Sequence, residues 1–389
     1  MKKQLNSLNL LKGIGILMVI MVHNRHFIMK DMTGYRQLIN YGQMGCQLFF
    51  MVSGMALCYS WYHLTEKYQV SSSKLTFRQR ISCSGQFILR RYLRLIPGFI
   101  IILCINYLLN VLFIDILEHS PGFIMNRKPA AIITNLLFIH GFFPDYINSV
   151  FPGGWYIGTT FILYALFPLF IFIFEKLYAL KRPLIILIPP VLLLLNYMLL
   201  KHITLATQYE YYPYNNSFLY YFFTNQMTCF SLGILLFFQE KTNFSSKCPL
   251  PVSAALFIVT CYTCIHYYLL PEQNFIYSIL PSIVGFSFYW LAVSFIHIEL
   301  RAAKGTNAFF NFIASCGSNS YGMYLVHAFI SWYALKDLSY FLTTVKEYEY
   351  NDLLLYCIVY IPSVLAIYAL GRCMKRVLDF IDKKLRPSG

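Results

Sequence analysis

The chain has 389 residues, of which 58% are hydrophobic and only 12% are charged. This composition excludes an ordinary soluble domain, in which about a quarter of the residues are charged. The formal net charge is +15, but no recognised nucleic-acid-binding motif accompanies it. We therefore attribute the charge to the cytoplasmic loops of a polytopic membrane protein.

Ten apolar segments are long enough to cross a bilayer as helices, which takes about 20 residues each. The predicted spans lie near 8–28, 42–62, 95–117, 155–175, 183–201, 218–238, 252–270, 276–298, 312–335 and 352–372. The sequence thus predicts an all-α integral membrane protein, a single bundle of about ten transmembrane helices with both termini cytoplasmic. No linker, charge block or repeat separates a further domain, so we treat 1–389 as a single membrane domain.

The distribution of basic residues supports this topology. With ten spans and an inner N-terminus, 22 lysines and arginines fall on the inner side and eight on the outer side. The apolar segment 130–141 is too short to cross, and counting it as a span would reverse part of this bias. We therefore predict that it forms a re-entrant or interfacial helix in an outer region, 118–154.

The first span places two titratable side chains on one helix face. Eleven helical steps separate Lys12 from His23, so the two side chains lie on one stripe, about 16 Å apart along the axis. Burying an ionisable group at the bilayer centre costs about 3 kcal/mol, which makes both residues functional candidates. The alternatives are that Lys12 snorkels to the inner surface and that His23 only forms a hydrogen bond between helices.

Histidine is the group best suited to proton chemistry inside this membrane domain. The acids nearest to spans all lie at predicted span ends, and the unperturbed pKa of histidine suits a general base. His23 is the leading candidate, ahead of His327, His140, His266 and His297. The cysteines, 11 in number, indicate free thiols rather than a disulfide framework, and we predict no metal site at the C-x-x-C of Cys261 and Cys264.

A cluster of arginines precedes the third predicted span. Arg90, Arg91 and Arg94 lie three and four residues apart, which on a helix places their guanidinium groups on adjoining faces. Planar guanidinium groups bind phosphates in a bidentate manner, so the cluster is a candidate site for a phosphorylated ligand. The alternative is ordinary anchoring of a helix at the inner surface.

Four motifs in order resemble the membrane-bound acyltransferase-3 family, whose members O-acylate surface glycans in bacteria. They are Lys12 with His23, Phe49-Phe50-Met51-Val52-Ser53-Gly54, the arginine cluster followed by Pro97, and Ser320-Tyr321-Gly322-Met323-Tyr324-Leu325-Val326-His327. The resemblance extends from about residue 7 to 372. It implies catalytic roles for His23 and Lys12, acyl-CoA binding by Arg90, Arg91 and Arg94, and further site residues at Ser53, Trp155, Tyr164 and His327.

One position departs from the family pattern. Family members often carry Trp-Ser-Leu-x-x-Glu before a tyrosine and a proline, and the corresponding residues here are Trp155, Tyr164 and Pro168. Thr160 occupies the place of the glutamate. A carboxylate role at this position is therefore not expected in this chain.

The resemblance implies an O-acyltransferase, most simply an O-acetyltransferase, of the bacterial inner (cytoplasmic) membrane. The donor substrate would be cytoplasmic acetyl-CoA or another acyl-CoA, with no bound cofactor or metal. The acceptor would be a hydroxyl of a surface or lipid-linked polysaccharide of the cell envelope, near the tyrosine-rich outer loop 202–217, whose tyrosines equally suit an interfacial aromatic belt. The rival interpretation is a transporter or flippase for a polar or lipid-linked substrate. Against it, the sequence shows no internal repeat of the kind that many transporters have.

Overall fold

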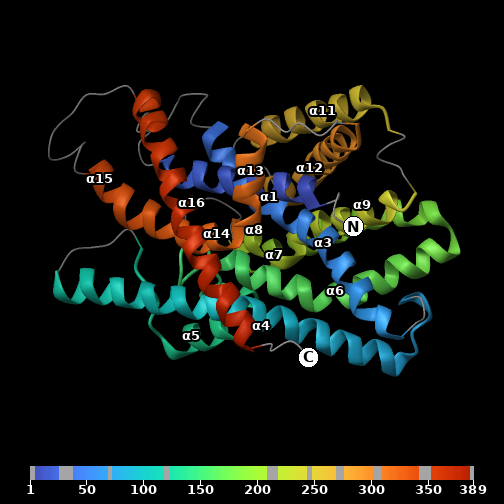
Figure 1. Ribbon diagram of the computed structural model, residues 1–389, viewed down its shortest axis with the longest axis horizontal. Coiled ribbons are helices and arrows are strands. Elements are labelled where there is room, and N and C mark those ends of the chain that lie inside the picture. The colour runs from blue at the N-terminus through green and yellow to red at the C-terminus, as the bar shows by residue number, and fades with distance from the viewer. Residues whose placement is uncertain are drawn as a thin grey trace. The chain divides into compact units, whose positions relative to one another are not determined.

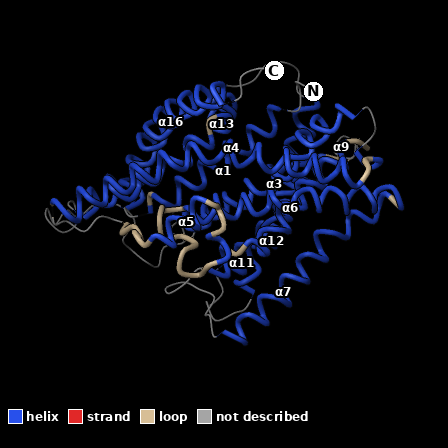
Figure 2. Tube along the Cα trace, turned by 90° about the horizontal axis from the view of Figure 1, so that it is seen from below, coloured by secondary structure: helices blue, strands red, loops and turns tan. Residues whose placement is uncertain are grey.

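The structure is a computed structural model in which the described residues form helices, turns and loops and no strand (Figures 1 and 2). The residues that it describes are 5–25, 38–68, 72–117, 123–207, 218–242, 248–268, 276–301, 308–340 and 352–385. The tyrosine-rich stretch 208–217 and His26 lie outside them, and so does the side chain of His266.

Seven helices within the described residues are long and apolar enough to cross a membrane. They are Leu38–Tyr68, Phe77–Ile116, Gly154–Leu180, Arg182–Leu205, Phe218–Glu240, Ile279–Ile298 and Leu353–Lys384. Three shorter apolar helices, Ser7–His23, Leu250–Cys264 and Ala308–Ser318, lie where three further spans are predicted. The chain is thus an all-helical multi-pass membrane protein, while the count of ten and the side on which the termini lie remain predictions.

Contacts divide the chain into two compact units. Unit 1 comprises Met1–Leu11, Gln47–Leu93 and Tyr156–Asn307, and unit 2 comprises Lys12–Cys46, Arg94–Trp155 and Ala308–Gly389. Each unit collects segments from distant parts of the sequence, so the division does not correspond to two successive domains.

Unit 1 contains most of α3 (Gly45–Thr65) and α6 (Gly154–Leu180), the first half of α4 (Phe77–Asn110), α7 (Ile188–Thr207), α8 (Phe218–Tyr221), α9 (Phe223–Glu240), α11 (Leu250–Tyr268) and α12 (Ile276–Arg301). Two glycines bring α3 and α9 into backbone contact. A Cβ atom on Gly54 would lie 2.2 Å from the carbonyl oxygen of Phe230, and one on Gly233 would lie 1.8 Å from that of Met51. Small residues allow close helix approach in membrane proteins, so Gly54 in the Phe-Phe-x-x-Ser-Gly motif serves packing.

The start of α4 is set by a capping box. The Thr76 hydroxyl accepts a hydrogen bond from the backbone N–H of Gln79 at 3.3 Å, and the Gln79 side chain accepts one from the N–H of Thr76 at 2.9 Å. These reciprocal bonds satisfy two donors at a helix N-terminus. The helix therefore begins at Phe77 rather than near residue 95, where the third span is predicted to begin.

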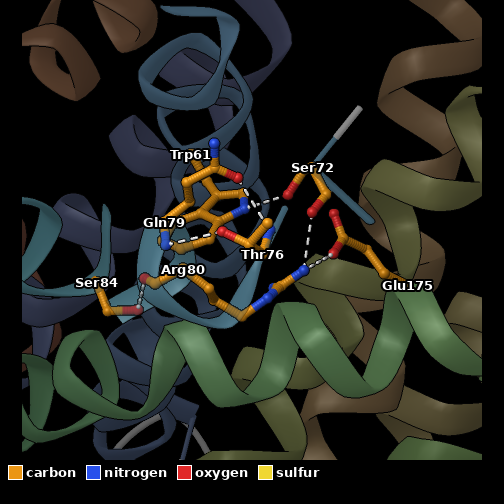
Figure 3. A network of polar contacts seen from close by, with 7 residues as sticks. All are labelled: Trp61, Ser72, Thr76, Gln79, Arg80, Ser84 and Glu175. Atoms are coloured by element: carbon orange, nitrogen blue, oxygen red, sulfur yellow. Dashed lines mark hydrogen bonds and ion pairs between the residues drawn. The ribbon is translucent and has the colours of Figure 1, made fainter. Parts of the chain in front are cut away.

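An ion pair is buried just after this capping box (Figure 3). The guanidinium of Arg80 lies 3.2 Å from the carboxylate of Glu175 on α6 and also donates to the carbonyl of Ser72 at 2.8 Å. Only 14% of the Arg80 side chain and 4% of the Glu175 side chain are exposed. Glu175 lies inside α6, because this helix continues past the predicted span end to Leu180.

Unit 2 contains most of α1 (Leu5–His23), the second half of α4, α5 (Pro129–Leu136), α13 (Ala308–Ser318), α14 (Ser320–Phe329), α15 (Lys336–Tyr340) and α16 (Asp352–Leu385). Two segments are π-helical, Val111–Ile116 and Ile330–Leu335. Helix α5 has eight residues, about 12 Å, which is too short to cross a bilayer and agrees with excluding 130–141 from the spans.

The predicted span 312–335 is not one continuous α-helix. It is interrupted at Asn319, which separates α13 from α14, and it then passes into the π-helix Ile330–Leu335. Close contact between α14 and α16 accompanies the interruption, since a Cβ atom on Gly322 would lie 2.3 Å from the carbonyl oxygen of Gly371. This geometry places the Ser-Tyr-x-x-Tyr-Leu-x-His motif on a short helix of its own.

Candidate active site

Lys12 and His23 lie on the single continuous helix α1, as predicted. Both side chains are half-buried, and eleven helical steps separate them by about 16 Å along the axis. A Cβ atom on Gly13 would lie 1.9 Å from the carbonyl oxygen of Ile313, so α1 and α13 are in backbone contact directly beside Lys12. The helix therefore keeps Lys12 and His23 apart, and the two side chains lie at different depths along α1.

A second histidine lies against His23. The ring centroids of His23 and His327 are 4.9 Å apart with an interplanar angle of 51°, and the ring of Trp332 lies 6.2 Å from that of His23. The two histidines come from nearly opposite ends of the sequence and meet within unit 2. The structure thus brings together two of the predicted site residues and adds Trp332, which the sequence analysis did not single out.

The hydrogen bonding of His327 fixes its tautomer. Its Nδ1 lies 2.5 Å from the carbonyl oxygen of Tyr324, and because a carbonyl can only accept, Nδ1 carries the proton in this bond. The Nε2 atom is buried and makes no hydrogen bond within the part of the chain that the structure describes. In the neutral ring, Nε2 therefore presents a lone pair that can accept a proton.

Tyr324 connects this histidine to the loop before α6. Its hydroxyl donates to the carbonyl oxygen of Gly153 at 2.8 Å, and its ring packs against His327 at 4.9 Å between centroids. Gly153 has a φ of +83°, a left-handed conformation that favours glycine, and its N–H donates to the side chain of Asn148. The loop thereby delivers the buried Trp155 at the start of α6 within unit 2.

His140 lies in the same unit, in the turn that follows α5. Its Nε2 donates to the carbonyl oxygen of Gly154 at 3.1 Å, and its ring stacks on Phe99. Burial lowers the pKa of His140 to about 4, opposed only weakly by the carbonyl groups of Gly154 and Thr134. A histidine held neutral in this way orients the Gly153-Gly154 turn rather than titrating near neutral pH.

The arginine cluster is distributed over the helix surface of α4. The guanidinium of Arg91 donates to the hydroxyl of Ser60 and lies over the rings of Phe87 and Tyr164, 5.2 and 6.0 Å from their centroids. Arg90 and Arg94 are exposed. The structure therefore joins Arg91 to Tyr164, another predicted site residue, within unit 1.

The two remaining candidates of unit 1 are hydroxyl residues on α3 and α6. Ser53 is half-buried on α3, next to the packing glycine Gly54. Thr160 is buried, and its hydroxyl makes no hydrogen bond to any residue that the structure describes. At the place of the family glutamate, this chain therefore has a buried, uncharged hydroxyl instead of a carboxylate.

Comparison with known families agrees with the motifs. A family model described as an acyltransferase domain matches residues 5–372, nearly the whole chain. No curated protein and no solved structure matches the chain. Because this model covers nearly the whole of a multi-pass helical protein, the chain belongs to the acyltransferase-3 family and is an acyltransferase.

Proposed function

We propose that this membrane acyltransferase moves an acetyl group from cytoplasmic acetyl-CoA to a sugar hydroxyl of a surface or lipid-linked polysaccharide in the bacterial inner membrane. The pairing of His23 with His327 carries the proposal, because O-acylation needs a base for the acceptor hydroxyl. A neutral imidazole offers a lone pair that can act as this base.

In this proposal His23 removes the proton of the acceptor hydroxyl while the oxygen attacks the thioester carbonyl. A carbon–oxygen bond forms, the carbon–sulfur bond breaks, and the electron pair of that bond leaves with sulfur. The proton on the imidazolium then passes to the CoA thiolate, so that CoA leaves as the thiol. A transient acyl group on His23 is the alternative route and gives the same products.

His327 supports the base in both routes. Because its Nδ1–H is bonded to the Tyr324 carbonyl, Nε2 stays unprotonated in the neutral ring and can accept a proton from its neighbour. A lone pair held by a fixed tautomer costs no reorganisation at the moment of transfer. Trp332 beside His23 supplies an apolar, aromatic wall to the same place.

The donor is assigned to the basic stretch of α4. Acyl-CoA carries several phosphate charges, and Arg90, Arg91 and Arg94 offer guanidinium groups at the end of this helix that is predicted to be cytoplasmic. Lys12, about 16 Å from His23 along α1, is assigned to the thioester carbonyl or to CoA itself.

The test uses membranes that contain the full chain, supplied with radiolabelled acetyl-CoA. Alkali-labile label in glycan reports O-acetylation. His23→Ala should reduce transfer about 100-fold or more while the protein remains in the membrane. His63→Ala is the matched control, since the His63 side chain is 77% exposed and pairs with Glu66 on the next turn. Substantial transfer by the His23 variant would remove this residue from its central role.

A further inference from the structure

The residue that follows His23 is a fully buried asparagine whose amide nitrogen and oxygen both form hydrogen bonds. The Asn24 amide Nδ2 donates to the hydroxyl of Ser363 at 2.5 Å, and the hydroxyl of Ser331 donates to Asn24 Oδ1 at 3.1 Å. Ser363 directs its own proton to the carbonyl of Tyr360 at 2.8 Å, so its oxygen must accept from Asn24. Asn24 is therefore clamped from two elements.

Helix α16 fixes the height of α1 by further bonds of the same kind. The hydroxyl of Tyr356 donates to the carbonyl of Met21 at 3.0 Å, and that of Tyr360 donates to the carbonyl of Leu17 at 3.0 Å. Together with Ser363, these two tyrosines hold the last two turns of α1 at one register. These bonds go to the backbone of α1, so the orientation of the His23 side chain depends on other contacts, at the end of the helix.

The π-helix Ile330–Leu335 supplies those contacts. Three consecutive residues of it reach four partners: Ser331 bonds Asn24, the ring of Trp332 lies against His23, and Tyr333 bonds two asparagines of α4. The π-helix continues directly from α14, which carries His327. One continuous backbone therefore holds His327 and, through Ser331, the residue next to His23. Short π-helical segments are frequent at functional sites.

We propose that Asn24 and Ser331 are positioning residues that fix the angle and separation of His23 relative to His327. This inference rests on the catalytic role of His23 in the proposed function. Neither residue is assigned any contact with substrate. Their effect is geometric, since misplacing a catalytic group by about 1 Å can cost two orders of magnitude in rate.

A role in packing alone predicts a different result from a positioning role. Loss of a buried hydrogen bond lowers stability wherever the bond lies, but only a bond that orients the histidine pair lowers the maximal rate of the folded enzyme. The matched control is Ser315, whose hydroxyl bonds that of Tyr368 at 2.7 Å between α13 and α16.

The experiment measures acetyl transfer by membranes as a function of acetyl-CoA concentration, per amount of folded protein. For Ser331→Ala we expect a maximal rate lowered roughly tenfold with KM for acetyl-CoA changed less than about twofold. Ser315→Ala should keep the wild-type rate. For Asn24→Ala, which also loses the bond to Ser363, we expect a maximal rate at least as low as that of Ser331→Ala. Adding Ser331→Ala to Asn24→Ala should lower the maximal rate no further, because the bond between the two residues is already lost.

A wild-type maximal rate for Ser331→Ala, or an equal fall for Ser315→Ala, would overturn the inference. If the Asn24 variant does not accumulate, the comparison of Ser331 with Ser315 decides alone. His23→Ala separates the two proposals. An inactive His23→Ala with an unaffected Ser331→Ala contradicts only the positioning role, whereas an active His23→Ala contradicts the proposed function itself.

Discussion

The hydroxyl of Tyr324 donates a hydrogen bond to the carbonyl oxygen of Gly153, 2.8 Å away, and so ties the loop before α6 to the helix that carries His327. The contact leaves little room for a side chain on the glycine, since a Cβ atom there would lie 3.0 Å from the tyrosine oxygen. The loop conformation and the histidine pair are therefore coupled through one tyrosine.

Gly153→Ala should lower both the unfolding temperature and acetyl transfer. Its φ of +83° costs a residue with a Cβ atom about 1–2 kcal/mol, and the methyl group would also push on Tyr324. Gly154→Ala is the control, since its Cβ atom would meet nothing closer than 3.6 Å. Thermal unfolding in detergent and the membrane assay measure the two effects, and equal behaviour of the two variants would contradict the coupling.

Arg91→Lys should raise KM for acetyl-CoA roughly tenfold, which is about 1.4 kcal/mol of binding. A lysine keeps the charge but cannot reproduce a planar group that lies over Phe87 and Tyr164 and bonds Ser60. Arg78→Lys, exposed on the same helix, should leave KM unchanged. A wild-type KM for the Arg91 variant would favour simple anchoring of the helix.

Glu175→Gln should destabilise the protein by about 3–5 kcal/mol, because it leaves the buried guanidinium of Arg80 without its counter-charge. The control is Asp115→Asn, which breaks the ion pair of Asp115 with Arg127. The side chains of this pair are more exposed, 44% for Asp115 and 34% for Arg127. A pair of that exposure contributes about 0–1 kcal/mol. Chemical or thermal unfolding of the two variants measures the difference, and similar losses would argue against a structural role for burial of the pair.

His140 should make the protein less stable in mild acid. Its pKa is about 4 in the folded state against 6.5 for an ordinary histidine, so below pH 6.5 the unfolded state binds the proton more readily. The full free energy of unfolding is therefore available above pH 6.5, and about 3 kcal/mol of it is lost as the pH falls to 4. His140→Gln cannot titrate, so the difference between wild type and variant over this range isolates the effect. An identical pH dependence would show that His140 is not responsible.

Much of the membrane architecture follows from the sequence, because apolar length and charge bias act locally. The shared helix of Lys12 and His23 is confirmed, and 130–141 does not form a crossing helix. The start of α4 was also readable, since Thr76 and Gln79 have capping-box spacing. A search for long apolar segments misses this start, because the first turns of the helix are polar.

The site itself was predictable only in part. The resemblance points to His23 and His327 separately, but their contact depends on how α1 packs beside the helix that is interrupted at Asn319. Gly317 and the Ser318-Asn319-Ser320 stretch are local signals of that interruption, but they do not predict which helix packs against it. Trp332 and Ser331 had no distinguishing signal, because their importance comes from a π-helical turn. Such a turn depends on tertiary contacts rather than on local residue preference.

Helix α4 is 34 residues long, and its length bears on where the proposed acyl-CoA donor would bind. A straight helix of this length measures about 51 Å, whereas the hydrocarbon layer is about 30 Å thick. A helix longer than the hydrocarbon layer tilts, kinks at a residue such as Pro97 or extends beyond the lipid, and the polar first turns of α4 suit a position outside the hydrocarbon layer better than its apolar second half does. In the proposed function, these polar first turns with their arginines would receive the nucleotide-bearing donor directly on the membrane helix.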